Sequence, residues 1–219
     1  MSCLLVVDFQ NDFCQGGPLA IKGTGVGQKI TYEVNRALSF KFIQTFGNAS
    51  EEEDFDMIAF TLDWHPPNHV SFASTHGKQP FEEIDVPYGK QIMWPDHCVQ
   101  NTEGSKLHKG IGIPRDAHFV YKGTKIDVDS YSAFFDANRE DTGLDKLLKD
   151  NDIRTVYICG LALDVCVKYT AIDCASLGYS TYVLKRACGA VYPENNEQTL
   201  NELEKHGVVC IESMSNRIV

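Results

Sequence analysis

The sequence predicts an α/β fold built around a mainly parallel sheet of about six strands. Two observations lead to this fold class. Short apolar runs rich in β-branched residues alternate with segments of helical periodicity, and this alternation favours parallel strands joined by right-handed helical crossovers. A chain of 219 residues with 43% hydrophobic content can also bury one sizeable core. We therefore expect one domain covering residues 1–219.

Six runs have the composition of buried strands. They lie at residues 3–7, 57–62, 118–121, 155–159, 179–184 and 208–211. Helices are predicted at residues 26–46, 144–149, 164–177 and 194–206. The first of these has Ile30, Val34, Leu38 and Phe42 at four-residue steps, which is the spacing of an amphipathic helix.

Two further segments are predicted to be irregular. Residues 51–54 form an acidic run that we interpret as a solvated loop or helix tip. Residues 65–115 form a long, proline-punctuated insertion, and loop regions of this length in compact domains are usually functional.

Charge and cysteine usage restrict the class of partner. The net charge of −10 argues against a nucleic-acid or anionic-membrane surface, so a small-molecule partner is expected. No apolar stretch approaches the roughly 20 residues of a membrane span, and Met1 leads directly into the first strand. The eight cysteines include no Cys-x-x-Cys pair. We therefore expect reduced thiols and a cytoplasmic protein, and leave open whether it forms a homo-oligomer.

Reactive residues follow four of the predicted strands. Asp8, Asp63, Lys122 and the segment 160–166 each begin where an apolar run stops. In an open parallel sheet, ligands bind beyond the carboxyl ends of the strands, because the loops converge there. These groups are therefore expected to share one rim.

Three of these residues have the chemistry of a cysteine nucleophile and its partners. Cys166 falls at the first turn of a predicted helix, where N–H groups favour a thiolate and can stabilise an oxyanion. Taken singly, Cys166 could be an inert buried thiol, Lys122 an edge lysine and Asp8 a turn former. Together they supply a nucleophile, a base and the cation that an adjacent thiolate and carboxylate require.

A second cluster has the spacing of a metal site. Asp63 and His65 lie two apart at a strand end and point the same way, and one more distant histidine would complete a facial set. Three ligands with open positions suit a catalytic or substrate-orienting Zn²⁺, Mn²⁺ or Fe²⁺. The other histidines are interpreted as polar surface or capping residues: His69, His76, His108, His118 and His206.

Six motifs, in this order along essentially the whole chain, resemble those of nicotinamidases, which belong to the isochorismatase-like cysteine hydrolase superfamily. The motifs are VVDFQNDFCQGGPLA (6–20), DWHPPNHVSFAS (63–74), WPDHCVQNTEGS (94–105), YKGT (121–124), DSYSAFFD (129–136) and CGLALDVCVKYTAIDCASLGY (159–179). The resemblance implies a three-layer αβα sandwich and hydrolysis of nicotinamide to nicotinate and ammonia, through a cysteine thioester, in NAD salvage. Pyrazinamide is expected as a further substrate.

The resemblance also assigns roles to residues, as follows. It implies a catalytic triad of Asp8, Lys122 and Cys166. It implies an oxyanion hole of backbone N–H groups from Ala162 and Cys166, with a cis peptide bond at Leu161–Ala162. It implies Asp63, His65 and His97 as ligands of one divalent ion, most simply Zn²⁺, and it places Phe13, Trp64 and Tyr131 around the pyridine ring.

Three alternatives remain open at this point. The chain could be another superfamily amidohydrolase acting on a different small amide, or an isochorismatase, although members acting on isochorismate lack the metal cluster. It could be a zinc hydrolase in which a metal-bound hydroxide attacks and Cys166 is structural. It could also be an inactive binding protein, which the three intact triad positions disfavour.

Overall fold

The computed structural model describes residues 1–40, 42–46 and 49–214, and it confirms the expected α/β fold. The central sheet has six strands, and every neighbouring pair is parallel. In spatial order the strands are β10 (Val209–Ile211), β9 (Ser180–Gly189), β8 (Thr155–Leu161), β1 (Ser2–Val7), β4 (Met57–Asp63) and β7 (His118–Lys122).

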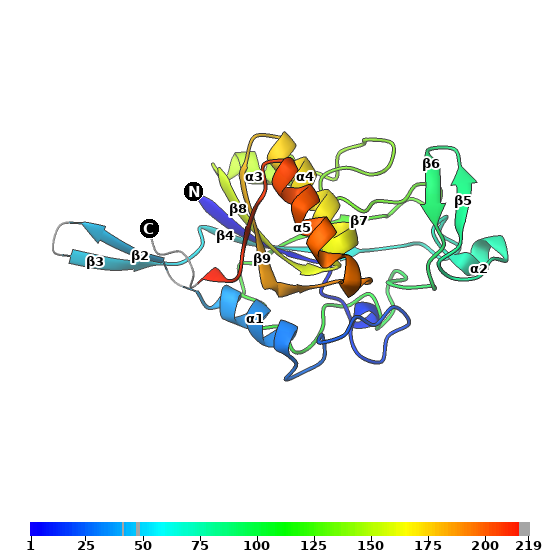
Figure 1. Cartoon of the computed structure of the whole chain (residues 1–219), viewed down its shortest axis with the longest axis horizontal. Coiled ribbons are helices and arrows are strands. Elements are labelled where there is room, and N and C mark those ends of the chain that lie inside the picture. Colours follow the sequence, from blue (N-terminus) through cyan, green and yellow to red (C-terminus); the bar gives the residue numbers. More distant parts are fainter. Residues whose placement is uncertain (41, 47–48, 215–219) are drawn as a thin grey trace.

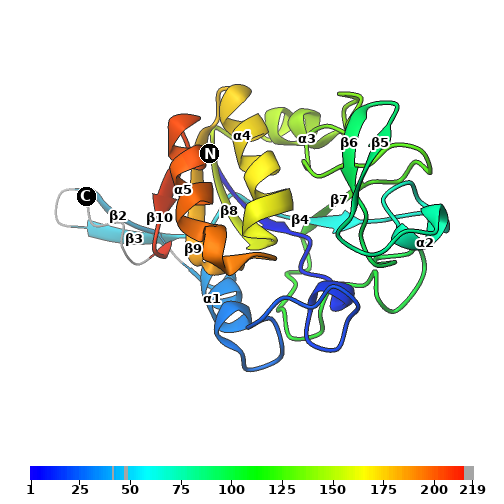
Figure 2. The same ribbon diagram turned by 45° about the vertical axis from the view of Figure 1, so that its right-hand side comes forward.

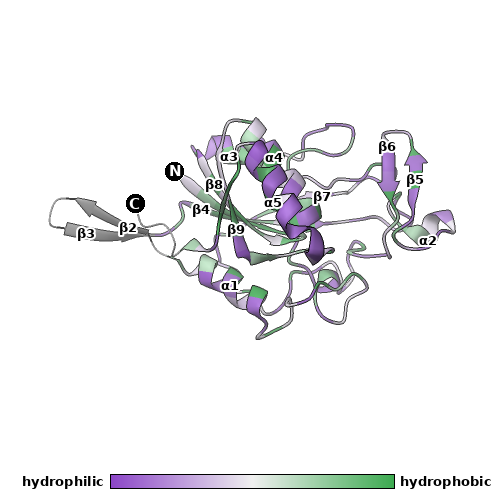
Figure 3. Cartoon of the chain, viewed as in Figure 1, coloured by the Kyte–Doolittle hydropathy of each residue, from purple (hydrophilic) through white to green (hydrophobic). Residues whose placement is uncertain are grey.

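Helices cover both faces of the sheet and complete the three layers (Figures 1 and 2). One face carries α1 (Lys29–Leu38), and the other carries α3 (Leu144–Asp150), α4 (Lys168–Ser176) and α5 (Asn196–Lys205). A central strand covered on both faces has no polar side to present, which explains the unbroken apolar run of β1. The central strands are accordingly hydrophobic, whereas much of α5 is hydrophilic (Figure 3).

The predicted helix at residues 26–46 is too long. It ends at Leu38, where Ser39 follows and its hydroxyl donates to the carbonyl oxygen of Asn35 at 3.0 Å. Strand β2 (Phe42–Phe46) then pairs antiparallel with β3 (Ala49–Glu53). Phe42 continued the helical spacing only by coincidence. The acidic run at residues 51–54, which was interpreted as a solvated loop or helix tip, lies largely in β3.

The insertion at residues 65–115 is mostly irregular but contains two small elements. These are the short helix α2 (Ala73–His76) and a hairpin of β5 (Glu83–Val86) and β6 (Gly89–Ile92). The hairpin lies at the carboxyl end of β4 and β7, away from β2 and β3 (Figures 1 and 2). No helix in the described part of the chain is both long and apolar enough to cross a bilayer.

The connectivity of the sheet creates one crevice. From β1 the chain adds β4 and then β7 on one side, and it later adds β8, β9 and β10 on the other. The order therefore reverses between β1 and β8, and ligand sites of open α/β sheets lie at the carboxyl ends of strands at such a point.

Candidate active site

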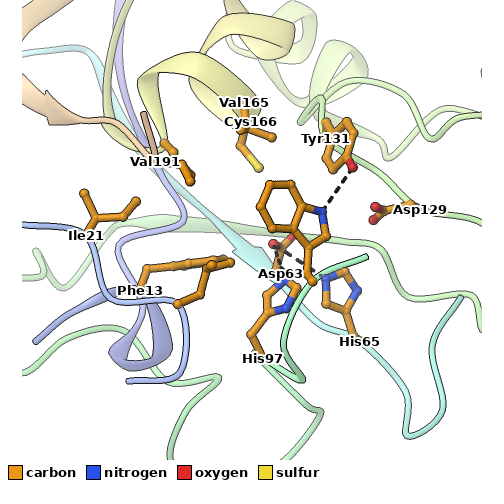
Figure 4. A pocket seen from close by; sticks show the side chains of 13 residues that line it. Phe13, Ile21, Asp63, His65, His97, Asp129, Tyr131, Val165, Cys166 and Val191 are labelled. Atoms are coloured by element: carbon orange, nitrogen blue, oxygen red, sulfur yellow. Dashed lines mark hydrogen bonds and ion pairs between the residues drawn. The ribbon is translucent and has the colours of Figure 1, made fainter. Parts of the chain in front are cut away.

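A cavity lies at this reversal point. Its lining comes from the end of β4, the segments that follow β1, β7, β8 and β9, and the insertion. Figure 4 shows Cys166 on one side of the cavity and Asp63, His65 and His97 opposite it. The lining residues are Phe13, Leu19, Ile21, Asp63, His65, Trp94, His97, Asp129, Tyr131, Ala162, Val165, Cys166 and Val191.

Lys122 connects the reactive groups of the site. Its Nζ atom lies 2.9 Å from Asp8 Oδ2, 3.4 Å from Cys166 Sγ and 2.8 Å from the carbonyl oxygen of Ser130, and it also bonds Asp63 Oδ1. The ammonium is fully buried. A buried cation is tolerated only when it is paired and hydrogen-bonded, and Lys122 meets this condition through two carboxylates and a carbonyl.

Asp8 is held in position by its backbone and by Thr61. Its φ is +46°, an uncommon left-handed value for a residue other than glycine, and its N–H group donates to the carbonyl oxygen of Thr61 on β4. The Thr61 hydroxyl donates to Asp8 Oδ1 at 2.5 Å. Asp8 Oδ2 pairs with Lys122 but has no well-aligned hydrogen-bond donor among the described residues, so it retains capacity for a proton.

Burial and charge set the protonation states of the acid and the thiol. Burial raises the pKa of Asp8 to about 6, although Lys122 opposes the increase. Burial also raises the pKa of the Cys166 thiol well above its usual range, again against Lys122. Near neutral pH the site therefore holds a protonated thiol and a carboxylate that can accept its proton.

The loop after β8 places Cys166 beside these groups. Gly160 has φ +118°, and a Cβ atom on it would lie 2.1 Å from the carbonyl oxygen of Val7, so only glycine permits this approach of β8 to β1. The Leu161–Ala162 peptide bond is cis, as the resemblance implied. One turn of π-helix follows at Leu163–Val167, and the carbonyl oxygen of Ala162 accepts hydrogen bonds from Val165 and Val167. π-Turns of this kind are frequent at functional sites.

Asp63, His65 and His97 come together as a buried cluster. Asp63 Oδ2 lies 3.6 Å from His65 Nε2 and 3.8 Å from His97 Nε2, and one ligand atom from each residue lies within 4.8 Å of the others. Asp63 thus faces Lys122 with one oxygen and the histidines with the other.

The donor set fits a divalent ion. Nδ1 of His65 lies 2.9 Å from the carbonyl oxygen of Gly123, and Nδ1 of His97 lies 2.7 Å from that of Pro95. Because a carbonyl oxygen only accepts, each Nδ1 carries the hydrogen and each Nε2 lone pair faces Asp63, as in metal-binding imidazoles. The carboxylates of Asp8 and Asp63 both contact the single nearby ammonium, that of Lys122, and Asp129 lies close to His65, so a divalent cation would balance the excess negative charge.

Protonation of the histidines reflects the same surroundings. Burial alone would lower the pKa of His65, but the adjacent Asp63 outweighs it and raises that pKa. Burial and the neighbouring His65 lower the pKa of His97 to about 4. His97 is therefore neutral at physiological pH and can offer a lone pair.

One predicted pocket residue lies elsewhere. Phe13 and Tyr131 line the cavity, but Trp64 does not, and its ring packs edge-on against Tyr121, with centroids 5.1 Å apart. The chain alternates sides at this strand end, so a residue between Asp63 and His65 points away from both. The indole in the cavity is Trp94, from the insertion.

Sequence reasoning missed several neighbours of the site. His69 was interpreted as a surface or capping residue, but it is fully buried, and its ring stacks on His65 with centroids 4.1 Å apart. Gln10 bonds both the N–H group and the carbonyl oxygen of Asp63 through its side-chain amide. Asp129 lines the cavity. Only its place in the DSYSAFFD motif could have drawn attention to Asp129.

The fold and the site define a class of molecule: a hydrolase with a parallel α/β sheet and a buried cysteine beside an acid and a cation. Comparison with known proteins agrees with this class. The model of the isochorismatase domain matches residues 2–215, and the chain belongs to the isochorismatase family. Within it, the chain is 45% identical to a nicotinamidase of Acinetobacter baylyi, over 86% of this chain and 81% of that protein. It is 40% identical to a nicotinamidase of Escherichia coli, over 93% of this chain and 91% of that protein.

Solved structures give the same result. A nicotinamidase and pyrazinamidase of Acinetobacter baumanii superposes with a TM-score of 0.85 at 38% identity, covering 98% of this chain and 97% of that one. A pyrazinamidase of Pyrococcus horikoshii in complex with zinc superposes with a TM-score of 0.74 at 34% identity, covering 96% of this chain and 98% of that one.

Proposed function

We propose that the protein is a nicotinamidase, a hydrolase that converts nicotinamide to nicotinate and ammonia, in salvage of the nicotinamide ring for NAD. The observation that carries this proposal is the position of Lys122, whose ammonium contacts Asp8, Asp63 and Cys166 at the edge of one cavity. The nicotinamidase relatives support the substrate. Pyrazinamide is proposed as a second substrate, since the Acinetobacter baumanii relative is described as acting on both.

Acylation begins with transfer of the thiol proton from Cys166 to Asp8, while the ammonium of Lys122 stabilises the ionised pair. The thiolate attacks the carboxamide carbon, and the carbonyl oxygen becomes an oxyanion. The N–H groups of Ala162 and Cys166 would stabilise it, a contribution of about 3 kcal/mol per donor in comparable sites. Asp8 then donates its proton to the departing nitrogen, the C–N bond breaks, and ammonia leaves a thioester on Cys166.

Deacylation uses the same carboxylate. Asp8, ionised again, accepts a proton from a water molecule that attacks the thioester carbon, and the C–S bond then breaks. Asp8 returns its proton to the Cys166 thiolate, and the acid formed leaves as nicotinate after giving its proton to solvent, so the site is regenerated. One buried acid with a pKa of about 6 is suited to both half-reactions.

The pyridine ring of nicotinamide would lie among the aromatic side chains of Phe13, Trp94 and Tyr131, in the cavity that the metal ligands also line. Asp63, His65 and His97 would hold one divalent ion, and we propose Zn²⁺ because a relative is described in complex with zinc. When bound, such an ion would supply a Lewis-acidic position that orients the pyridine nitrogen.

Two broader assignments belong to the same proposal. We infer a single domain over residues 1–219, with the insertion at about 65–115 contributing cavity residues, since the family model matches residues 2–215. A cytoplasmic location is supported by the thiols, because all eight cysteines are free and the cytosol is reducing.

The decisive experiment is Cys166→Ala, assayed by coupled detection of ammonia released from nicotinamide. We expect turnover to be lost while metal content and melting temperature stay near those of the parent protein. Cys210→Ala, which changes a half-buried cysteine outside the cavity, should retain activity. Substantial ammonia release by Cys166→Ala would refute the thioester and favour attack by metal-bound hydroxide. A parent protein that released no ammonia from nicotinamide but hydrolysed another amide would refute the assignment of nicotinamide as the substrate.

A further inference from the structure

Three aliphatic side chains, which we call the aliphatic wall, lie between the catalytic cavity and a second, outer cavity. Leu19 and Ile21 come from the loop after β1, and Val191 follows β9; each of the three lines both cavities. Figure 4 shows Ile21 and Val191 across the catalytic cavity from Asp129 and Tyr131. The catalytic cavity therefore has one apolar side and one polar side, and the apolar side separates it from the outer cavity.

The Ile21 part of the wall is packed closely and tied to the backbone. Its N–H group donates to the carbonyl oxygen of Phe13 at 2.9 Å, and its own carbonyl oxygen accepts from the hydroxyl of Thr24 at 2.6 Å. A Cβ atom at Gly189, the last residue of β9, would lie 2.7 Å from Ile21 Cγ2. The end of β9 therefore packs directly against Ile21, so the two segments that form the wall are in contact.

Val191 is held by the carboxylate of Asp164. The N–H group of Val191 donates to Oδ1 at 2.9 Å, and the next N–H group, that of Tyr192, donates to Oδ2 at 2.8 Å. Both carboxylate oxygens accept, whereas an amide of the same size would present an NH₂ group to one of the two donors. Asp164 belongs to the π-turn that carries Cys166. The same turn therefore positions the nucleophile and one part of the aliphatic wall.

We propose that Val191 determines which ring-substituted amides the site accepts, and that Asp164 is the residue that positions it. In the proposed function, on which this inference rests, the carboxamide lies at Cys166 and the ring nitrogen at the cation site. With the ring faces against the aromatic side chains, the part turned to the aliphatic wall is an edge of C–H groups. An unsubstituted edge makes apolar contact there, whereas a methyl group on that edge would overlap the wall.

The test variant is Val191→Ala, which removes two methyl groups from the wall and joins the two cavities. The methyl groups of 2-methylnicotinamide and 5-methylnicotinamide lie on opposite edges of the ring. Because only one edge faces the wall, we expect kcat/KM for one of these amides to rise about tenfold relative to nicotinamide, as is usual for one methyl group in an apolar pocket. A gain for neither amide, or an equal gain for both, would overturn the proposal.

Two control variants separate the shape of the wall from other effects. Val191→Thr keeps the branched shape of the side chain and should therefore keep the selectivity of the parent protein. Val209→Ala makes the same truncation at an exposed position of β10 that lines neither cavity, and it should also leave the selectivity unchanged. A gain for the same amide in either control would refute steric exclusion by Val191.

Asp164→Asn tests the positioning role. One of the two N–H groups at residues 191–192 would lose its acceptor, so the amide favoured by Val191→Ala should gain about threefold over nicotinamide, the effect of one hydrogen bond. The ratio of the two kcat/KM values is the readout, because general destabilisation lowers both alike. In the double variant Asp164→Asn should add little, and Asp150→Asn, exposed on α3, is the matched control.

The outcomes distinguish this inference from the proposed function. An unchanged ratio in an active Asp164→Asn variant would overturn the role of Asp164, and an unchanged ratio in an active Val191→Ala variant would overturn the proposal as a whole. Neither result would affect the assignment of nicotinamide as the substrate. A parent protein that released no ammonia from nicotinamide would instead refute the proposed function.

Discussion

The ammonium of Lys122 lies between two carboxylates that serve different purposes. Asp8 faces the thiol and Asp63 faces the two histidines, and both reach the same Nζ atom. The two carboxylates raise the pKa of Lys122 well above its usual range despite burial, so its charge is permanent. The acyl-transfer residues and the metal ligands are consequently one electrostatic unit.

The activity should depend on the ionisation of Asp8. Its pKa is raised to about 6, and only the ionised carboxylate can accept the thiol proton. Protonation on the acid side therefore removes the base, and kcat/KM should fall about tenfold per pH unit below pH 6. Initial rates of ammonia release between pH 4.5 and 8 test this. A profile that stayed flat down to pH 5 would contradict the assignment.

Replacing Lys122 by Met should raise the pKa of Cys166, because Lys122 is the neighbour that lowers it. We expect the alkylation rate of Cys166, followed against pH by peptide mass spectrometry, to shift to higher pH. The variant should also lose about 3–5 kcal/mol of stability, since it leaves buried carboxylates without a cation. Lys125→Met, at an exposed position, serves as the control. An unshifted alkylation profile would show that Lys122 does not stabilise the thiolate.

At the scale of the element, the close approach of β1 and β8 places the acid and the thiol together. Asp8 follows β1 and Cys166 follows β8, and these strands are neighbours in the sheet. Gly160 pairs with Val7, and the space beside it leaves no room for a Cβ atom. Gly160 can therefore affect catalysis although it has no side chain, because it sets the distance between the ends of β1 and β8.

Gly160→Ala should separate these two strand ends. The new Cβ atom would overlap the backbone of Val7 and would also have to adopt φ +118°. We expect a melting temperature lower by about 6–10 °C, corresponding to 2–3 kcal/mol, together with loss of most activity. Gly178→Ala has a similar φ of +93° but nothing within 4 Å, so it should cost less and leave kcat intact. Equal effects of the two variants would exclude steric contact as the cause.

At the scale of the whole molecule, the cation site joins the insertion to the sheet. Asp63 and His65 come from the end of β4, whereas His97 comes from the insertion that also supplies Trp94. An ion bound by all three would hold the insertion against the strand ends. Binding to the native state alone stabilises a fold by mass action.

Removal of the ion should therefore lower the melting temperature. At a free concentration 1,000 times Kd the loss would be about 4 kcal/mol, measured by calorimetry with and without a chelator. His97→Ala should bind less metal by elemental analysis and lose this response, whereas His76→Ala, at an exposed position, should keep both. Full metal occupancy in His97→Ala would remove it from the ligand set.

Much of this molecule could be predicted because its signals are local. Each strand of the sheet is a contiguous apolar run, and parallel strands place their ends at one edge, so Asp8, Asp63, Lys122 and Cys166 could be assigned to one rim. Motif order then indicated the family. The end of α1 was misjudged because Phe42 continued the helical spacing, while the pairing of β2 with β3 depends on residues further along the chain.

The sequence by itself determined the fold class, the family and the residues at the strand ends, since these follow from local periodicity and from motifs. Only the tertiary structure decided which indole lines the cavity and how Lys122 is shared between Asp8 and Asp63. The physical reason is that these contacts form only when the ends of β1, β4 and β7 lie side by side and the irregular insertion folds over them. No periodicity records which side chains such a loop brings together.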